Sequence, residues 1–510
     1  MFLWILILGS ITAFLTACGI GANDVANAFA TVIGAKVLTF KQVIVVATIF
    51  EFSGAVLMGS RVTDTIRKGI VDNDLFEDNP EVLMFGMLCA SISTMVWLAL
   101  ATYLKWPVST THSTVAGVLG FSLVYAIDTN TVSDSIKWNK VYLIIASWLI
   151  SPLLSGFFTL MIFLTNKYLA FTKENPIKRT LIIFPMMIGL TIIVNIFFII
   201  YKGSPQLDLD EIELWKAFAI AFGIGSGLMM ITYITIYLLY DRILDALAKK
   251  YDENIQRHDL EWDEMMGIQR IEGSPAGESS TDDEPRIVIT DVDNADIDNE
   301  DIDNTNIDNP DLEAGLPREE ENRTVRRFEH EKFKQMQQFD PKIEHMFSYL
   351  QIITSCLDSF AHGANDVANS IGPYAAIYTI YRDGAFASKS DVPIWILIGG
   401  GAGIVLGLWL FGYRIIDRVG HQLAGITPTR GFAMELGSSI TVVLASRLSI
   451  PVSTTHCQVG SVTFGGLADG RKNVDLKVLG VIVLSWVLTL PAAGLLSAVL
   501  FMFGGYSPRV

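Results

Sequence analysis

The string GANDVANA occupies residues 21–28, and GANDVANS occupies residues 363–370. The first copy follows twenty mostly apolar residues that include no charged side chain. Its Asn and Asp side chains are therefore expected within or beside a deeply apolar helix, where polar groups without partners are costly. Ionisable residues in such segments mark functional sites by default. The recurrence of the string predicts that both copies serve one function.

A second motif recurs in the same order as the first. PVSTTHSTVAG begins at Pro107 and PVSTTHCQVGS begins at Pro451, 344 residues later, while Asp24 and Asp366 lie 342 residues apart. A weaker pair, GSRVTDTI from Gly59 and GYRIIDRV from Gly412, supports the same register. Two long motifs in one order predict a duplicated unit.

The composition is that of a membrane protein with one polar insert. Of 510 residues, 51% are hydrophobic, and the formal net charge is −16. The segment 241–345 holds 30 acidic and 13 basic residues, which leaves 23 acidic and 24 basic residues for the other 405. We therefore expect an N-terminal membrane repeat at 1–240, an acidic, disordered cytosolic loop at 241–345 and a C-terminal membrane repeat at 346–510.

Apolar segments predict an all-α polytopic membrane protein with about twelve spans, because a span needs about 17–25 apolar residues. Four of the twelve segments are short or rich in Gly, Ser and Thr, which favours half-helices or re-entrant hairpins. The expected spans are 2–22, 41–60, 82–104, 110–127, 141–165, 180–201, 214–240, 346–362, 393–412, 431–448, 455–468 and 476–503, and the four short ones are 110–127, 346–362, 431–448 and 455–468.

The charged loops predict the orientation in the membrane. Loops 166–179 and 413–430 are basic and are expected in the cytosol, whereas loop 202–213 is acidic and is expected outside. Both termini then lie outside and the acidic loop lies inside. On this topology the first GANDVANA ends its span at the inner side and the second ends its span at the outer side. The repeats are thus inverted, an architecture typical of secondary transporters.

The GANDVAN motif offers hard-oxygen ligands for a small cation. Asn23 and Asn27 are four residues apart in a helix and Asp24 precedes Asn27 by three, so all three share a face. Gly21 suits a helix break that would free further backbone oxygens. The second copy supplies Asn365, Asp366 and Asn369, and two more acids within apolar runs, Glu51 and Glu435, are candidates by the same reasoning.

The PVSTTH motifs predict an anion site. Proline favours the first turn of a helix, and Ser or Thr satisfies the N–H groups exposed there, so such a helix start can bind an oxyanion. Asp24 and Asp366 beside the anion suit one that carries its own proton, such as phosphate, and disfavour sulfate. The candidate phosphate ligands are Asp24, Asp366, Ser109, Thr110, Thr111, Ser453, Thr454 and Thr455.

No catalytic motif accompanies these residues. Neither a phosphate-binding loop of the Gly-x-x-x-x-Gly-Lys-Ser/Thr type nor a Gly-x-Ser-x-Gly elbow occurs, so neither ATP-driven transport nor hydrolysis is predicted. The four cysteines show no metal-site or disulfide spacing. We expect no enzyme activity, no resident cofactor and no nucleic-acid partner.

At these residues the chain resembles the inorganic phosphate transporter (PiT) family, and most of all its eukaryotic, fungal-type sodium–phosphate symporters. The resemblance covers 1–240 and 346–510 and includes GANDVANA, FEFSGAVL, SFAHGANDVANS, GFAMEL and both PVSTTH strings. It implies sodium-coupled phosphate import by alternating access, a homodimer in the plasma membrane, and half-helix hairpins at the PVSTTH motifs. It also implies that Asp24, Asp366, Glu51 and Glu435 act in transport.

Two alternatives remain open from the sequence. One keeps the fold and couples phosphate, or sulfate, to protons, since the four intramembrane acids suit either coupling. The other is a phosphate sensor or receptor whose acidic loop signals, and that loop is its only support.

Overall fold

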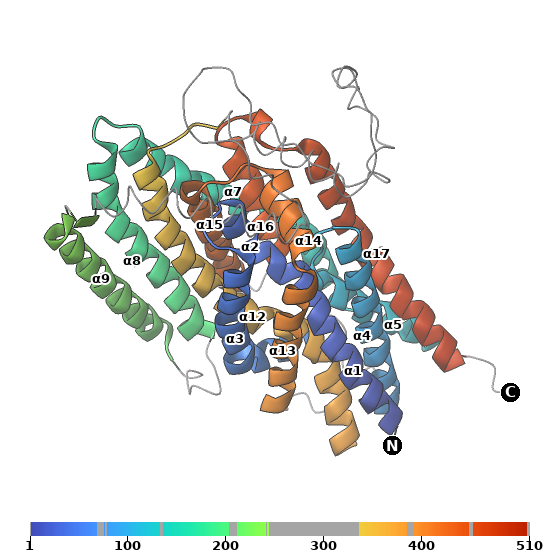
Figure 1. Cartoon of the computed structure of the whole chain (residues 1–510). Coiled ribbons are helices and arrows are strands. Elements are labelled where there is room, and N and C mark those ends of the chain that lie inside the picture. The colour runs from blue at the N-terminus through green and yellow to red at the C-terminus, as the bar shows by residue number, and fades with distance from the viewer. Residues whose placement is uncertain are drawn as a thin grey trace, which may run out of the picture.

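The computed structural model is all-helical and describes residues 2–68, 76, 79–132, 136–202, 212–240, 242–243, 336–384, 392–447 and 452–506 (Figure 1). Among these residues, nine helices are long and apolar enough to cross a membrane. The predicted all-α class is therefore confirmed, and twelve spans stay a prediction. Most of the acidic segment 241–345 lies outside the described residues, and the prediction that this segment is disordered falls on them.

The helices follow the apolar segments of the sequence closely. They are α1 Leu3–Ile20, the π-helical turn η1 Gly21–Val25, α2 Ala26–Gly34, α3 Phe40–Lys68, α4 Pro80–Tyr103, α5 Thr110–Asp128, α7 Trp138–Asn166, η3 Lys167–Phe171, α8 Pro176–Lys202, α9 Leu214–Leu238, α12 Pro341–Asp383, α13 Ile394–Phe411, α14 Tyr413–Ile416, η6 Asp417–Leu423, α15 Pro428–Arg447, α16 Thr454–Leu467, η7 Arg471–Asn473 and α17 Leu476–Tyr506.

Large apolar side chains cover the outside of the helical bundle. Leu149 on α7, Tyr237 on α9 and Phe503 on α17 are each more than 70% exposed. Apolar surface of this extent is unfavourable in water and is satisfied by lipid. The exterior therefore supports the predicted membrane location of the helices.

Both GANDVAN motifs lie inside longer helical segments, although the first candidate span, Leu3–Val25, ends within the first motif. The first copy runs through η1 into α2, and the second lies in the middle of the 43-residue helix α12. The helix break expected at Gly21 is thus wrong, because the chain forms only a π-helical turn there, and the helix of the second copy continues past the expected end of its span at residue 362. The polar residues lower the local hydropathy of the sequence, but the helix continues through them. It can do so because their side chains form hydrogen bonds with other helices.

The motif glycines bring helices into backbone contact. A Cβ atom on Gly21 would lie 1.8 Å from the carbonyl oxygen of Ile404 on α13, and one on Gly363 would lie 2.0 Å from that of Glu51 on α3. Gly407 and Gly54 return these contacts, against the carbonyl oxygens of Cys18 and Phe360. Glycine at these positions therefore permits close packing of the helices and does not interrupt them.

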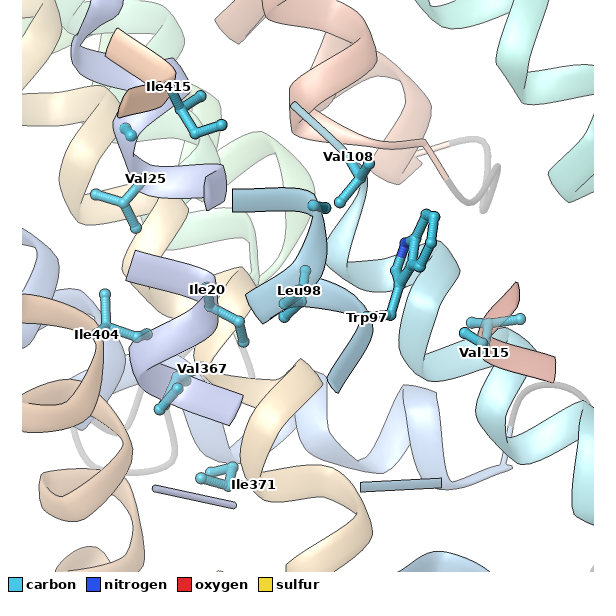
Figure 2. Close-up of a cluster of buried hydrophobic side chains, with 14 of the residues drawn as sticks. Ile20, Val25, Trp97, Leu98, Val108, Val115, Val367, Ile371, Ile404 and Ile415 are labelled. Atoms are coloured by element: carbon cyan, nitrogen blue, oxygen red, sulfur yellow. The ribbon is translucent and has the colours of Figure 1, made fainter. Parts of the chain in front are cut away.

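A hydrophobic cluster surrounds the first motif. Ile20 precedes η1 and Val25 ends it, and both pack in one buried cluster with Leu98 of α4, Val367 of α12 and Ile404 of α13 (Figure 2). Close packing from three other helices fixes the backbone around Asp24. The polar side chains of the motif are thus held on a rigid support.

Candidate functional site

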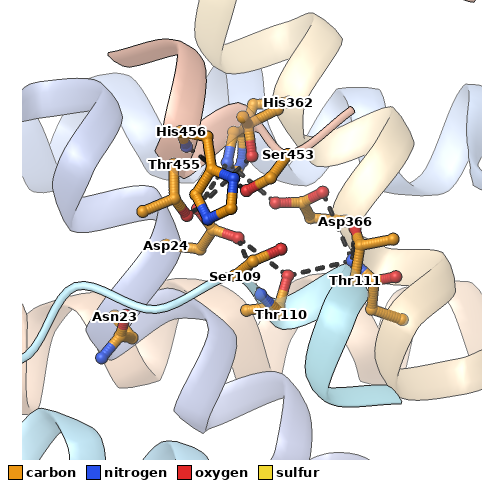
Figure 3. Close-up of polar contacts among 12 residues, drawn as sticks. Asn23, Asp24, Ser109, Thr110, Thr111, His362, Asp366, Ser453, Thr455 and His456 are labelled. Atoms are coloured by element: carbon orange, nitrogen blue, oxygen red, sulfur yellow. Dashed lines mark hydrogen bonds and ion pairs between the residues drawn. The ribbon is translucent and has the colours of Figure 1, made fainter. Parts of the chain in front are cut away.

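Asp24 lies between the starts of two helices that are far apart in sequence. Its Oδ2 atom accepts hydrogen bonds from the backbone N–H and the hydroxyl of Thr110, at 3.4 and 2.8 Å. Its Oδ1 atom accepts from the hydroxyls of Thr455 and Thr454, at 2.6 and 3.3 Å. Figure 3 shows Thr110 and Thr455 on opposite sides of the carboxylate. One buried acid therefore holds the first turns of α5 and α16 together.

The two PVSTTH strings form the same local structure. Ser109 caps α5 by accepting a hydrogen bond from the His112 N–H at 3.2 Å, and Ser453 caps α16 by accepting from the His456 N–H at 3.3 Å. The helices begin at Thr110 and Thr454, close to the predicted starts, but Pro107 lies before the cap of α5 and not in its first turn as expected. Because unpaired N–H groups give a helix start partial positive charge, two such starts around one carboxylate favour an anion between them.

The second GANDVAN copy reaches the same place. The Asn369 side chain donates to the hydroxyls of Thr110 and Thr111, at 3.0 and 3.1 Å, and contacts Asp366 Oδ1 at 3.4 Å. Predicted residues from four segments of the chain therefore meet at one site. We call this group the tip site, and it consists of Asp24, Thr110, Thr111, Asn369, Thr454 and Thr455.

The other predicted cation ligands are placed differently from one another. Asn23 bonds the loop before α5, through the Val108 N–H at 2.9 Å and the Trp106 carbonyl at 2.9 Å, and its side chain points away from Asp24 (Figure 3). Asn365 lines a pocket together with Asp24. The side chain of Asn27 lies outside the described residues.

Glu51 joins the tip site through a histidine that the sequence reasoning missed. His362 Nδ1 lies 2.8 Å from Glu51 Oε1, and the Ser359 hydroxyl donates to Glu51 Oε2 at 3.0 Å. His362 Nε2 lies 2.8 Å from Asp366 Oδ2 and 3.9 Å from Asp24 Oδ1. We call Glu51, Ser359, His362 and Asp366 the His362 cluster, and all four side chains are buried.

Glu435 forms a separate polar group. It accepts hydrogen bonds from Thr31 at 2.8 Å, from Gln351 at 3.1 Å and from Thr354. These partners lie on α2 and α12, so the buried carboxylate ties α15 to both motif-bearing helical segments. Hydrogen bonds of this kind offset part of the penalty for burying a charge.

Two acids, Asp24 and Asp358, line the pocket beside Asp24. Asp24, Asp358, His362, Asn365 and Thr454 line it together with Ala28, Ala361, Ser438, Val442 and Gln458. Closely spaced carboxylates in a low-dielectric site attract a cation strongly. The site can thus hold a small cation by oxygen ligands and an anion at the two helix starts.

The missed residues leave a signal in the sequence. The second motif follows SFAH at residues 359–362, whereas the first follows ACGI at residues 17–20. Polar Ser359 and His362 stand where the first copy has Ala17 and Ile20. Comparison of the flanks could have identified the pair, and Asp358, which stands where the first copy has Thr16, as well. Thr354 leaves no such contrast, because the first copy has Thr12 at that position.

Comparisons with known proteins agree with one another. A model of the phosphate transporter family matches residues 20–497. The phosphate-repressible phosphate permease pho-4 of Neurospora crassa is 32% identical, over 99% of this chain and 98% of that protein. Sodium-dependent phosphate transporter 2 of Homo sapiens is 30% identical, over 99% of this chain and 98% of that protein. A solved structure titled as the sodium-dependent phosphate transporter is similar, with a TM-score of 0.71, 30% identity and 99% of both chains covered.

Proposed function

The chain belongs to the phosphate transporter family, and on that premise we propose that it imports inorganic phosphate together with sodium by alternating access. The observation that carries the proposal is the position of Asp24, between the starts of α5 and α16. Two helix starts from the duplicated PVSTTH motifs there face one duplicated acidic motif, which suits a shared site for an anion and a cation.

Phosphate binds, in this proposal, at the tip site and the two serine caps. The helix starts and the hydroxyls of Thr110, Thr111, Thr454 and Thr455 donate to phosphate oxygens, and Ser109 and Ser453 hold the two helix starts in shape. Asp24 and Asp366 accept hydrogen bonds from the protonated oxygens of phosphate, which fully ionised sulfate lacks. This complementarity supports phosphate as the substrate.

Sodium binds beside phosphate and neutralises the acids there. Its proposed ligands are the oxygen atoms of the two GANDVAN motifs and the two intramembrane glutamates, because sodium favours hard oxygen ligands as calcium and magnesium do. These ligands are Asn23, Asp24, Asn27, Asn365, Asp366, Asn369, Glu51 and Glu435, of which Asn23 and Glu435 lie in separate polar groups and would serve a sodium ion other than the one beside Asp24. The two acids that line the pocket, Asp24 and Asp358, support a cation near Asp24 and Asn365 most directly.

The proposed architecture is two inverted repeats of twelve spans in total, with hairpins whose tips carry PVSTTH. The reciprocal glycine contacts support it, since α1 and α13 repeat the packing of α12 and α3. The chain direction of α1 is also opposite to that of α12 in Figure 1. At 14 residues, α16 is about 21 Å long and too short to cross a core of about 30 Å, which suits a half-helix.

The rest of the proposal concerns the orientation of the chain in the membrane and the membrane in which it lies. Both termini lie outside the cell and the acidic segment 241–345 lies in the cytosol, between membrane repeats 1–240 and 346–510. α1 begins and α17 ends on the same side in Figure 1, which supports a shared side for the termini. A homodimer in the plasma membrane follows from the family resemblance.

Proton coupling is the second candidate because His362 contacts carboxylates at both ring nitrogens. An imidazole among acids is a suitable proton carrier. The names of the relatives favour sodium, since they are called sodium-dependent phosphate transporters.

Uptake of radiolabelled phosphate into proteoliposomes tests the coupling. We expect an inward sodium gradient to drive accumulation at constant pH, and a proton gradient without sodium to drive little. Accumulation driven by protons with no response to sodium would replace the sodium proposal with the proton one. An excess of sulfate serves as the competitor control and is expected to leave phosphate uptake unchanged.

A further inference from the structure

A Ser-Trp pair recurs in the two helices that follow the PVSTTH motifs. α7 carries Ser147 and Trp148, and α17 carries Ser485 and Trp486. Both pairs come a few residues before a proline inside the helix, so they occupy similar positions in the duplicated sequence. The function proposed above assigns no role to either tryptophan.

Each of these two helices packs beside the PVSTTH helix of the other half of the chain. A Cβ atom on Gly120 of α5 would lie 2.1 Å from the carbonyl oxygen of Gly494 on α17. A Cβ atom on Gly460 of α16 would lie 2.5 Å from the carbonyl oxygen of Pro152 on α7. Such a close approach of two helix backbones requires glycine. α17 therefore lies against α5, and α7 lies against α16.

Trp486 contacts both PVSTTH strings at once. Its indole Nε1 atom donates a hydrogen bond to the carbonyl oxygen of Pro107, in the loop before α5, at 3.1 Å. The Ser485 hydroxyl reaches the same oxygen at 3.4 Å. The ring of Trp486 packs against the imidazole of His456 on α16, with 3.9 Å between the ring centroids. One buried side chain therefore joins the loop before α5 to the first turn of α16.

Trp148 lacks the corresponding contacts. Its Nε1 atom is buried and has no hydrogen-bond partner in the part of the chain that the structure describes. Its ring centroid lies 6.2 Å from that of His112 on α5, which is farther than the contact between Trp486 and its histidine. An indole N–H is only a donor, and when buried it usually finds an acceptor. Of the two tryptophans, only Trp486 therefore bonds a PVSTTH string.

We propose that Trp486 is a positioning residue for phosphate binding, a role that rests on the function proposed above. Its N–H and its ring fix the separation of the two helix starts whose hydroxyls bind phosphate. The proposed ligands Thr110 and Thr455 lie close to these two contacts along the chain and already share one carboxylate. Donors that must reach one anion from two sides tolerate little change in their separation, because hydrogen bonds require a narrow range of distances.

Binding of radiolabelled phosphate to the purified full-length protein in sodium tests this role. Trp486→Phe keeps an aromatic ring and removes the N–H. We expect it to raise the Kd for phosphate about 3–10-fold, since phosphate must then hold the helix starts at a separation that one hydrogen bond no longer fixes. Trp148→Phe is the matched control and should leave the Kd unchanged, because its N–H has no partner to lose. An unchanged Kd in Trp486→Phe, or an equal change in both variants, would overturn the proposal.

Transport kinetics separate positioning from folding. Sodium-driven uptake by Trp486→Phe should show a raised KM for phosphate and a maximal rate within about twofold of the wild type. A lowered maximal rate at unchanged KM would indicate loss of folded protein and would overturn the positioning role. Ser485→Ala removes the weaker donor to Pro107 and repeats the test where Trp486→Phe is misfolded, with an expected rise in Kd of about 2-fold. Wild-type protein that binds phosphate but does not accumulate it under a sodium gradient would refute the proposed function and leave the role of Trp486 in binding intact.

Discussion

The two GANDVAN motifs share their packing but differ in their chemical surroundings. Gly21 contacts the backbone of Ile404, and Gly363 contacts the backbone of Glu51 in the same manner. The side chain of Ile404 is apolar, whereas that of Glu51 binds His362. Backbone packing needs only glycine and a nearby carbonyl, so it tolerates either side chain. A duplicated framework can therefore carry an ionisable side chain at one of two equivalent contacts and an apolar side chain at the other.

The same contrast recurs between two helix pairs. The Ser91 hydroxyl lies 3.0 Å from that of Thr12 between α4 and α1, and the hydroxyl of Thr354 donates to Glu435 between α12 and α15. In the register of the repeats these contacts correspond, and a serine in one half stands where the other has a glutamate. The first half thus makes neutral contacts where the second makes charged ones.

The largest expected effect comes from the acid that both halves share. Asp24→Asn removes the charge that accepts hydrogen bonds from α5 and α16, and we expect sodium-driven phosphate uptake to fall about 100-fold or more. Asp366→Asn should also reduce uptake strongly. Surface expression is measured in parallel, and Asp128→Asn at the exposed end of α5 is the control. Normal uptake in both variants would show that the tip site is not the transport site.

The second prediction removes the difference between the copies. His362→Gln breaks the contact of the imidazole with Glu51 and Asp366, and we expect uptake to fall about 10–100-fold, since hydrogen bonds to charged groups contribute about 1.5–3 kcal/mol. His345→Gln on the same helix should transport normally. If His362→Gln transports as well as the wild type, the charged surroundings of the second copy are unnecessary for uptake.

The third prediction concerns what the copies share. Gly21→Ala and Gly363→Ala each place a Cβ against a facing backbone carbonyl, and we expect each to destabilise the fold by about 1–3 kcal/mol. Thermal unfolding in detergent reports the loss. Gly399→Ala on α13 meets no atom within 4 Å and should be neutral or stabilising. A large loss of stability in only one of the two variants would contradict the structural equivalence of the two motifs.

The smallest expected effects come from the threonine pair. Thr354→Val leaves a buried glutamate with one hydrogen bond fewer and should cost about 2 kcal/mol, whereas Thr12→Val loses a neutral contact and should cost about 1 kcal/mol. Thermal unfolding of both variants in one detergent measures the difference. Equal losses would mean that Glu435 gains little from Thr354.

Much of the fold was predictable because apolar length alone identifies long helices, as at α13 and α17. The meeting of Asp24 with Thr110 and Thr455 was also expected, because two copies of two motifs had to share one site. The continuation of α12 beyond residue 363 was not, because its polar side chains resemble a break until their partners are known. The contact between Glu51 and His362 joins residues 311 apart, so it depends on tertiary packing.

The position of Asp24 also bears on how readily phosphate leaves. Its carboxylate already accepts the hydrogen bonds of Thr110 and Thr455, as a phosphate oxygen would. Because the carboxylate is fixed to the protein, it competes with phosphate for these hydroxyls at a high effective concentration. Incoming phosphate must displace the carboxylate from the hydroxyls or share them with it. In the proposed transporter this built-in competitor lowers the affinity for phosphate, and it takes back the hydroxyls as phosphate departs. Release of phosphate is thereby favoured by the same side chain that defines the site.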